Sequence, residues 1–294
     1  MPLSREDRWL TGCLLLSVGL SCLLLGINAS QFHYTWIVYF PRLAAPLICV
    51  ALQFAYFDKC YSHISPRSGF ILRHCALYGL AHVALSFFVT GIQVTPFAPI
   101  DAALQHWDHT LHFDTAAVLA WTAAHPSLRA FLNLCYDSTD AQLALAPLAA
   151  GFAFDRRRMR VFLYAFTYAF LAGGLFYYYF PSSGPAGFYQ SPFFMNIQRL
   201  TTAKFFWVHH FQPVPTILGG MIAFPSFHVA WAVLTTYAAL PYRKLFWAAA
   251  ALNVLVVAST VLLGWHYLVD VPAGLILGGL SLYAGERTHR RLEA

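Results

Sequence analysis

The chain has 294 residues, of which 59% are hydrophobic and only 10% are charged. A soluble globular domain carries about 25% charged residues, so this composition excludes an ordinary soluble enzyme and indicates a membrane protein. The formal net charge is +6, which we expect to matter through its distribution across the membrane, and we expect no nucleic-acid partner.

Eight apolar segments are long enough to cross a bilayer as helices, which takes about 20 mostly apolar residues. In chain order they are Trp9–Ile27, Thr35–Phe57, Gly69–Val94, Ser127–Phe154, Arg160–Phe180, Met221–Leu240, Leu245–Leu263 and Trp265–Ala284. The fold class we predict is all-α, a polytopic transmembrane helical bundle of about eight spans. The fourth segment carries Asp137 and Asp140, and such carboxylates must face the bundle interior or water.

The Lys and Arg residues are unequally divided between the two faces that eight spans would create. Of the 18, four fall on the face away from the termini, and the remaining 14 (18 − 4) fall on the side of the termini; the four are Arg42, Arg129, Arg199 and Lys204. Because cytoplasmic loops carry the excess of Lys and Arg, this division predicts a multi-pass protein of the cell membrane with cytoplasmic termini. The two long connections, about 95–126 and 181–220, would then lie outside the cytoplasm.

Two short segments at the starts of the sixth and eighth predicted spans combine histidine with other polar residues. Phe224–His228 reads Phe-Pro-Ser-Phe-His, and Gly264–Asp270 reads Gly-Trp-His-Tyr-Leu-Val-Asp. The chain enters the membrane with the sixth span, returns with the seventh and enters again with the eighth. We therefore expect His228 and His266 to meet at one membrane face.

This combination of residues suits phosphoryl transfer. His266 and Asp270 are four residues apart, so on a helix they project from one side, and Asp270 can accept a hydrogen bond from one ring nitrogen. That bond fixes the tautomer and leaves the other nitrogen as a nucleophile, while His228 can protonate the leaving oxygen and later activate an acceptor. The free N–H groups at a helix start favour a phosphate, and the Ser226 hydroxyl would lie beside them.

The two segments resemble motifs of the type 2 phosphatidic acid phosphatase superfamily, over roughly residues 180–285. Its second motif, Pro-Ser-x-His, is matched by Pro225–His228, and the end of its third motif, His-x-x-x-Asp, is matched by His266–Asp270. The resemblance implies that His266 forms a phosphohistidine, that Asp270 orients it, and that His228 is the general acid and base. We expect neither a metal nor a cofactor to take part.

Departures from the superfamily pattern change the reaction that we expect. Ser259–Thr260 stands where typical phosphatases have Ser-Arg, so the phosphate-binding Arg is missing, and the first motif, Lys-x6-Arg-Pro, is also absent. The segment Tyr178–Ala186 resembles instead the Pro-rich segment of the inositol phosphorylceramide synthase branch, which transfers a phospho-headgroup between lipids. Phe113–Asp114 and Tyr136–Gln142 resemble bacterial members of this branch.

Without that Arg, other residues must bind the phosphate of the substrate. Arg199 and Lys204 are the only cations of the second long connection, and we expect them to contact the anion. Gly184 and Tyr189 of the same connection, together with Ser226, complete the binding site that we predict.

We therefore predict an integral membrane phosphotransferase that moves an inositol phosphate-like headgroup. The donor would be a membrane phospholipid or lipid phosphate, and the acceptor a lipid, a polyol or water. Residues 127–294 would form the catalytic core, built on the last five or six helices. Residues 1–126 would form a peripheral group of N-terminal helices with a His-rich extracytoplasmic loop.

Three alternatives stay open. The same site could hydrolyse a lipid phosphate such as phosphatidic acid or a polyprenyl diphosphate. Asp137 and Asp140 could instead mark the ion path of a transporter. His106, His109 and His112 recur every third residue and could ligate zinc in a membrane hydrolase, although an interfacial helix is the simpler interpretation.

Overall fold

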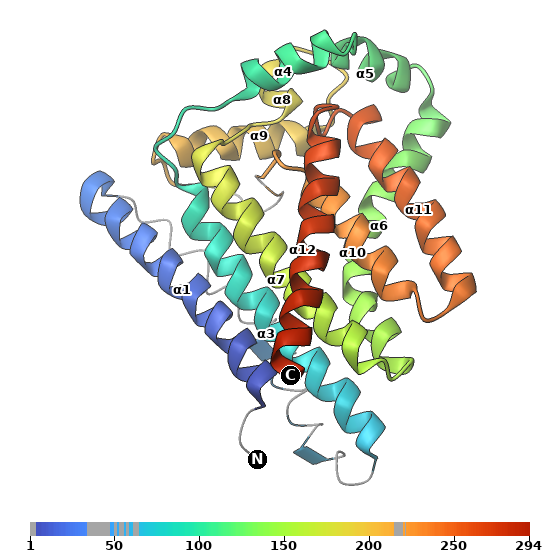
Figure 1. The fold of residues 1–294 in the computed structure, drawn as a ribbon. Helices are drawn as coiled ribbons and strands as arrows, with labels where there is room; N and C mark the ends of the chain where they lie inside the picture. Colours follow the sequence, from blue (N-terminus) through green and yellow to red (C-terminus); the bar gives the residue numbers. More distant parts are fainter. Residues whose placement is uncertain are drawn as a thin grey trace.

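The computed structural model describes residues 4–33, 65–214, 220 and 222–294, with single positions between 48 and 60. The regular elements of this part of the chain are all helices (Figure 1), so the predicted all-α class is confirmed. The described residues form α1 (Arg5–Phe32), α3 (Pro66–Gln93), α4 (Asp101–Thr110), α5 (Thr115–Ala123), α6 (Pro126–Phe152), α7 (Arg156–Tyr179), α8 (Pro185–Phe188), α9 (Asn196–His209), α10 (Phe227–Ala239), α11 (Arg243–Leu262) and α12 (Asp270–Glu293).

Four of the described helices, α1, α3, α7 and α11, are long and apolar enough to cross a membrane. The prediction of about eight spans is therefore wrong for the part of the chain that the structure describes. α10 has 13 residues, which is too short at about 1.5 Å per residue. α6 and α12 are long, but α6 carries Arg129 and two aspartates, and α12 has a charged C-terminal half. The predicted span Thr35–Phe57 falls largely outside the described residues.

Large apolar side chains are exposed on the outside of the bundle. On α1, Leu15, Leu16 and Leu23 are between 58% and 67% exposed, and on α11 Trp247 and Val254 are 64% and 68% exposed. Water does not favour apolar surfaces of this extent, whereas lipid chains do. The chain is therefore a multi-pass helical membrane protein.

α7 lies in the middle of the bundle and packs against α12, α3, α10 and α6. Its side chains Phe162, Tyr164 and Phe166 are at most 1% exposed and belong to the main apolar core. The short helices α4, α5, α8 and α9 lie across the end of the bundle that is opposite the two termini (Figure 1). This end, which we call the histidine end, contains His228 and His266.

Glycines on α12 allow α10 to lie directly against it. A Cβ atom at Gly274 would lie 2.5 Å from the backbone oxygen of Ser226, and one at Gly278 would lie 3.2 Å from the backbone oxygen of Ala230. Small residues at a helix contact let two backbones approach closely. The first turns of α10 and α12 are therefore held beside each other.

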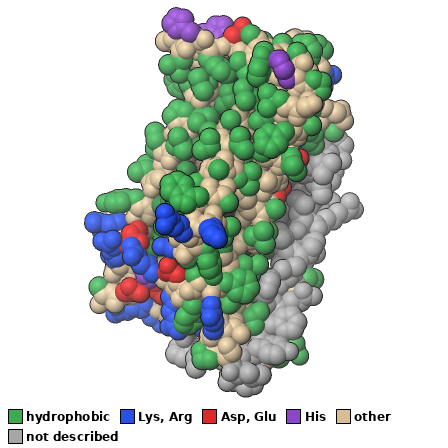
Figure 2. All heavy atoms as spheres, turned by 90° about the vertical axis from the view of Figure 1, so that its right-hand side faces the viewer, with side chains coloured by type: hydrophobic (Ala, Val, Ile, Leu, Met, Phe, Trp, Pro, Cys, Tyr) green, Lys and Arg blue, Asp and Glu red, His purple; other side chains and the backbone are tan. Residues whose placement is uncertain are grey.

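The other end of the bundle, which we call the terminal end, carries most of the charge. Figure 2 shows Lys and Arg side chains gathered toward this end and histidines at the opposite end. Inside the terminal end, Asp7 of α1 is 1% exposed and pairs with both Arg73 of α3 and Arg160 of α7. Glu6 pairs with Arg160 and with His289 of α12. This network of ion pairs, together with the contact between Glu6 and His289, joins four helices.

Candidate active site

His228 is positioned by the start of α10. Ser226 is the N-cap of this helix, and its side-chain oxygen accepts a hydrogen bond from the Val229 N–H at 3.4 Å. The Ser226 N–H donates to the carbonyl of Asp270 at 3.4 Å. His228 therefore lies in the first helical turn, next to the start of α12.

His266 lies in the loop before α12, because this helix begins only at Asp270. The prediction that His266 and Asp270 project from one face of a helix is therefore wrong in its geometry, although the two residues do meet. The N–H groups of Trp265 and His266 both donate to the carbonyl of Thr260 at 2.9 Å. These bonds fold the loop back over the end of α11, and Gly264, with φ 73°, supplies the left-handed conformation of the turn.

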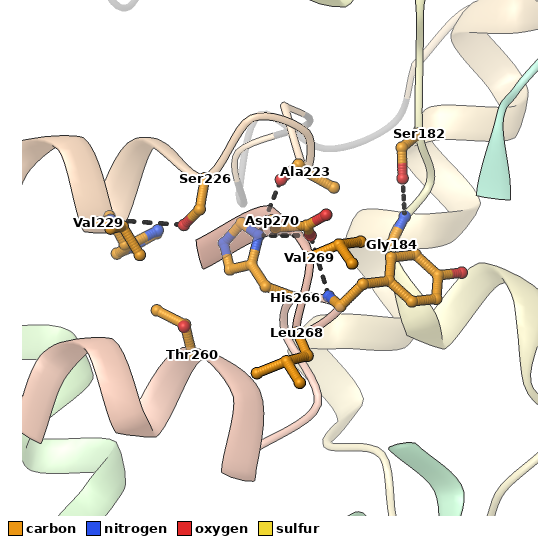
Figure 3. Close-up of polar contacts among 12 residues, drawn as sticks. Ser182, Gly184, Ala223, Ser226, Val229, Thr260, His266, Leu268, Val269 and Asp270 are labelled. Atoms are coloured by element: carbon orange, nitrogen blue, oxygen red, sulfur yellow. Dashed lines mark hydrogen bonds and ion pairs between the residues drawn. The ribbon is translucent and has the colours of Figure 1, made fainter. Parts of the chain in front are cut away.

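The ring of His266 has one nitrogen engaged with the protein. Its Nδ1 lies 2.8 Å from the carbonyl oxygen of Ala223 and 3.2 Å from Oδ2 of Asp270 (Figure 3). A carbonyl and a carboxylate can only accept hydrogen bonds, so Nδ1 must carry the proton. In the neutral ring, Nε2 then keeps its lone pair, which is the form that a nucleophile requires.

His228 faces His266 with the ring centroids 5.8 Å apart and the planes at 63°. The Tyr136 ring of α6 stacks on His228 at 4.1 Å, and its hydroxyl lies 3.3 Å from Nδ1 of His228. Trp265 stacks on the same tyrosine, with the planes only 5° apart. The Tyr136 hydroxyl thus occupies Nδ1 of His228, and Nε2 of His228 is left to transfer a proton.

Both histidines line a cavity of about 590 Å³. Its wall comes from α6, the loop around Gly184, α9, α10 and the loop before α12. Polar lining residues include Asp137, Asp140, Thr139, Ser183 and Gln198. The volume is in the range of pockets that bind small molecules or a lipid headgroup.

Two buried carboxylates of α4 hold the loops of the site. Asp108 accepts hydrogen bonds from the backbone N–H groups of Leu268 and Val269, at 2.9 and 3.0 Å. Asp101 accepts from the Ser183 N–H at 3.0 Å and from the hydroxyls of Ser182 and Tyr267, at 2.9 and 3.2 Å. One aspartate therefore fixes the loop between His266 and Asp270, and the other fixes the loop that contains Gly184.

Sequence reasoning missed these two aspartates. Asp101, Leu104 and Asp108 are buried and recur at i, i+3 and i+7, which is the pattern of one helix face. Two acidic residues within the buried stripe of a short amphipathic helix were the signal that could have identified them. Burial raises the pKa of both carboxyl groups, and the hydrogen bonds that they accept offset part of that effect.

The structure places one of the five predicted phosphate-binding residues in the described wall of the cavity. Gly184 lines the cavity, with φ 74° and the backbone oxygen of Trp265 3.3 Å from where its Cβ would stand. The other four are not among the described residues that line the cavity. Ser226 is a buried helix cap, and Tyr189 packs near Leu104 and Tyr267. Arg199 donates to the carbonyl of Pro192, and Lys204 is 5% exposed. Burial lowers the pKa of Lys204 to about 8.

The three histidines of the alternative zinc site do not converge. His106, His109 and His112 are all exposed, on or just after α4. Among the described residues, the group of His and acidic side chains close enough to share an ion is Glu6, His289 and Glu293, at the terminal end. The structure therefore gives no support to a zinc site at the histidine end.

A comparison with known protein families matches the part of the chain that contains the site residues. The sequence profile of the PAP2 superfamily, the type 2 phosphatidic acid phosphatases, matches residues 102–284, which contain His228, His266 and Asp270. Enzymes of this superfamily are membrane phosphatases and phosphotransferases that use a histidine nucleophile. No curated protein and no solved structure matches the chain. Because the match covers more than half of its length, the chain belongs to the PAP2 superfamily.

Proposed function

We propose that the protein transfers a phospho-headgroup from a membrane phospholipid or lipid phosphate to a lipid or polyol acceptor, through a phosphohistidine at His266. One observation carries the proposal. Nδ1 of His266 is held by Ala223 and Asp270, which leaves Nε2 as the reactive nitrogen, and His228 faces it across the same cavity. Inositol phosphate is the headgroup implied by the resemblance to the inositol phosphorylceramide synthase branch.

The first step forms the phosphoenzyme. Nε2 of His266 attacks phosphorus, and the bond between phosphorus and the oxygen of the leaving lipid alcohol breaks. The acid of this step is the protonated form of His228, which gives its Nε2 proton to that oxygen. Asp270 stabilises the positive charge that develops on the His266 ring, while the ring stays in place through Ala223.

The second step releases the headgroup to an acceptor. His228 is now neutral and takes the proton of the acceptor hydroxyl, whose oxygen attacks phosphorus. The bond between phosphorus and Nε2 of His266 breaks, which restores the nucleophile and leaves His228 protonated for the next cycle. If water takes the place of the acceptor hydroxyl, the product is that of hydrolysis. Headgroup transfer and hydrolysis therefore differ only in the acceptor.

The absence of Arg before His266 favours transfer over hydrolysis. Thr260 stands in that region, and its hydroxyl donates to the carbonyl of Val257 inside α11. Hydrolysis of a lipid phosphate remains the second candidate, since phosphatases belong to the same superfamily and polar residues line the cavity.

The membrane arrangement that we propose keeps the termini in the cytoplasm and the histidine end outside. The division of Lys and Arg along the chain supports it, since most of them belong to the side of the termini. In this arrangement residues 127–294 form the catalytic core, and residues 1–126 form the peripheral helices and the His-rich extracytoplasmic loop.

The test uses the purified full chain in detergent with a donor phospholipid labelled in its phosphate. We expect labelled protein whose label is lost in acid and stable in base, as a phosphohistidine requires, and its transfer to diacylglycerol or ceramide. Release of all label as a water-soluble phosphate, with no labelled lipid product, would contradict transfer and establish hydrolysis. Solute flux in vesicles that persists in His266→Ala, without lipid turnover in the wild type, would support the transporter instead.

A further inference from the structure

α6 brings two carboxylates to the wall of the catalytic cavity. Asp137 and Asp140 are both exposed, and both line the cavity that contains His228 and His266. Neither has an ion-pair or hydrogen-bond partner within the described part of the chain. The mechanism above uses neither of them.

The described wall of the cavity carries no Lys or Arg side chain to offset these carboxylates or a phosphate. The sequence from 205 to 242 contains neither residue type. A phosphate ester brought next to His266 would therefore face two carboxylates with no Lys or Arg in the described wall, and this arrangement is electrostatically unfavourable.

A second observation in the same wall indicates a bound ligand. Thr139 lies between the two aspartates in sequence, is 3% exposed and lines the cavity. Its hydroxyl oxygen has no hydrogen-bond partner among the described residues. A buried hydroxyl normally finds a partner, so an unpartnered one on a residue of the cavity wall points to a group that occupies the cavity.

Aromatic rings complete this part of the wall. Tyr136 and Trp265 stack nearly parallel at 5.1 Å, and both line the cavity together with Trp231. Aromatic faces attract ammonium groups, and Trp does so most strongly; Tyr136 already stacks on both His228 and Trp265, so the tryptophans are the rings that can serve here. Carboxylates, a buried hydroxyl and aromatic rings together form the usual surroundings of an organic cation.

We propose that Asp137, Asp140 and Thr139 form a subsite for the ammonium group of a zwitterionic phospholipid headgroup, of the ethanolamine or choline type. The substrate then brings the positive charge that no Lys or Arg supplies in the described wall. This inference rests on the proposed function, and it replaces only the inositol headgroup that the resemblance implies. A neutral polyol would leave the two carboxylates unpaired beside the phosphate.

The experiment compares donors with equal acyl chains on the purified full chain: phosphatidylethanolamine, phosphatidylcholine, phosphatidylinositol and phosphatidic acid. Each is assayed for release of its lipid product, with the chelator EDTA and again with magnesium. The variant is the double substitution Asp137→Asn and Asp140→Asn. The matched control is Asp114→Asn, which removes one exposed carboxylate of the N-cap of α5 outside the described cavity wall.

We expect kcat/KM for at least one ammonium-bearing donor to exceed that for phosphatidylinositol and phosphatidic acid by tenfold or more. We expect the double variant to reduce this preference to less than threefold and the control to keep it. The ratio between the ethanolamine and choline donors distinguishes a primary from a quaternary ammonium. Equal turnover of all donors, an unchanged preference in the double variant, or a preference that requires magnesium would overturn the ammonium subsite.

A binding measurement separates this inference from the proposed function. Short-chain versions of the four lipids are titrated into the wild type and the double variant, without following any reaction. Preferential binding of ammonium-bearing lipids without turnover of any donor would support the subsite and refute the transferase. Turnover of the donors without any preference among their headgroups would support the transferase and refute the ammonium subsite.

Discussion

The two ends of the bundle use buried carboxylates in different ways. At the terminal end, Asp7 pairs with Arg73 and Arg160, so the negative charge is neutralised by side chains from other helices. At the histidine end, Asp101 and Asp108 accept hydrogen bonds from loop backbone and hydroxyl groups, and no cation pairs with them among the described residues. Ion pairs join helices at one end, whereas carboxylate-to-backbone bonds shape loops at the other.

This difference bears on catalysis. The hydrogen bonds from the loop backbone to Asp108 keep His266 and Asp270 in fixed positions relative to each other, and they do so without an arginine near the substrate. Two other carboxylates of this end, Asp137 and Asp140, are exposed and line the cavity. The comparison therefore predicts that substitutions at the terminal end change stability, and that substitutions at the histidine end change turnover.

The largest effect should come from His266→Ala. Removal of the nucleophile should lower kcat by at least about ten-thousand-fold, because the covalent route is lost. The measurement is lipid turnover together with labelling of the protein by a phosphate-labelled donor. His106→Ala, at an exposed position on α4, is the matched control and should keep both. Labelling that survives in His266→Ala would assign the nucleophile to another residue.

The next effect concerns the terminal end. Asp7→Ala leaves Arg160 buried without its main partner, and we expect the free energy of unfolding to fall by about 3–5 kcal/mol. Denaturant unfolding in detergent measures the loss, while kcat per folded molecule should change less than about twofold. The control is Arg157→Gln, which breaks the exposed pair with Glu286 and should cost less than about 1 kcal/mol. A fall in kcat without a loss of stability would contradict the division of roles between the ends.

The motif residues of the site could be predicted from sequence because their spacing has a chemical meaning. The order of the predicted spans placed His228 and His266 at one end, and the structure brings them together. The local geometry of His266 could not be predicted, because α11 ends at Leu262, the following loop bonds back to the Thr260 carbonyl, and α12 begins only at Asp270, after a loop held by Asp108. The span count failed because segment length alone does not separate a short helix such as α10, or a polar one such as α6, from a true span.

The third effect tests the backbone-held loop. Asp108→Asn replaces one accepting oxygen with an N–H donor facing the N–H groups of Leu268 and Val269, so one of two charge-assisted bonds is lost. We expect kcat to fall by roughly 10- to 100-fold, on the scale of one hydrogen bond to a charged group, with KM changed less than about threefold. Asp114→Asn is the control, since Asn caps a helix as well as Asp. Equal losses in the two variants, or a loss confined to KM, would assign Asp108 a merely structural or a binding role.

The smallest effect should come from Gly274→Ala, which tests how closely the two catalytic helix starts must approach. The added Cβ would lie 2.5 Å from the backbone oxygen of Ser226, so the start of α10 must move and carry His228 with it. A displacement of a few tenths of an ångström between acid and nucleophile should lower kcat by about tenfold, because transfer depends steeply on the position of the reacting groups. Gly279→Ala, on the same helix with no atom within 4 Å of the new Cβ, should behave as the wild type. If Gly274→Ala keeps full turnover, then the α10–α12 contact tolerates movement and the position of His228 is set by Tyr136 instead.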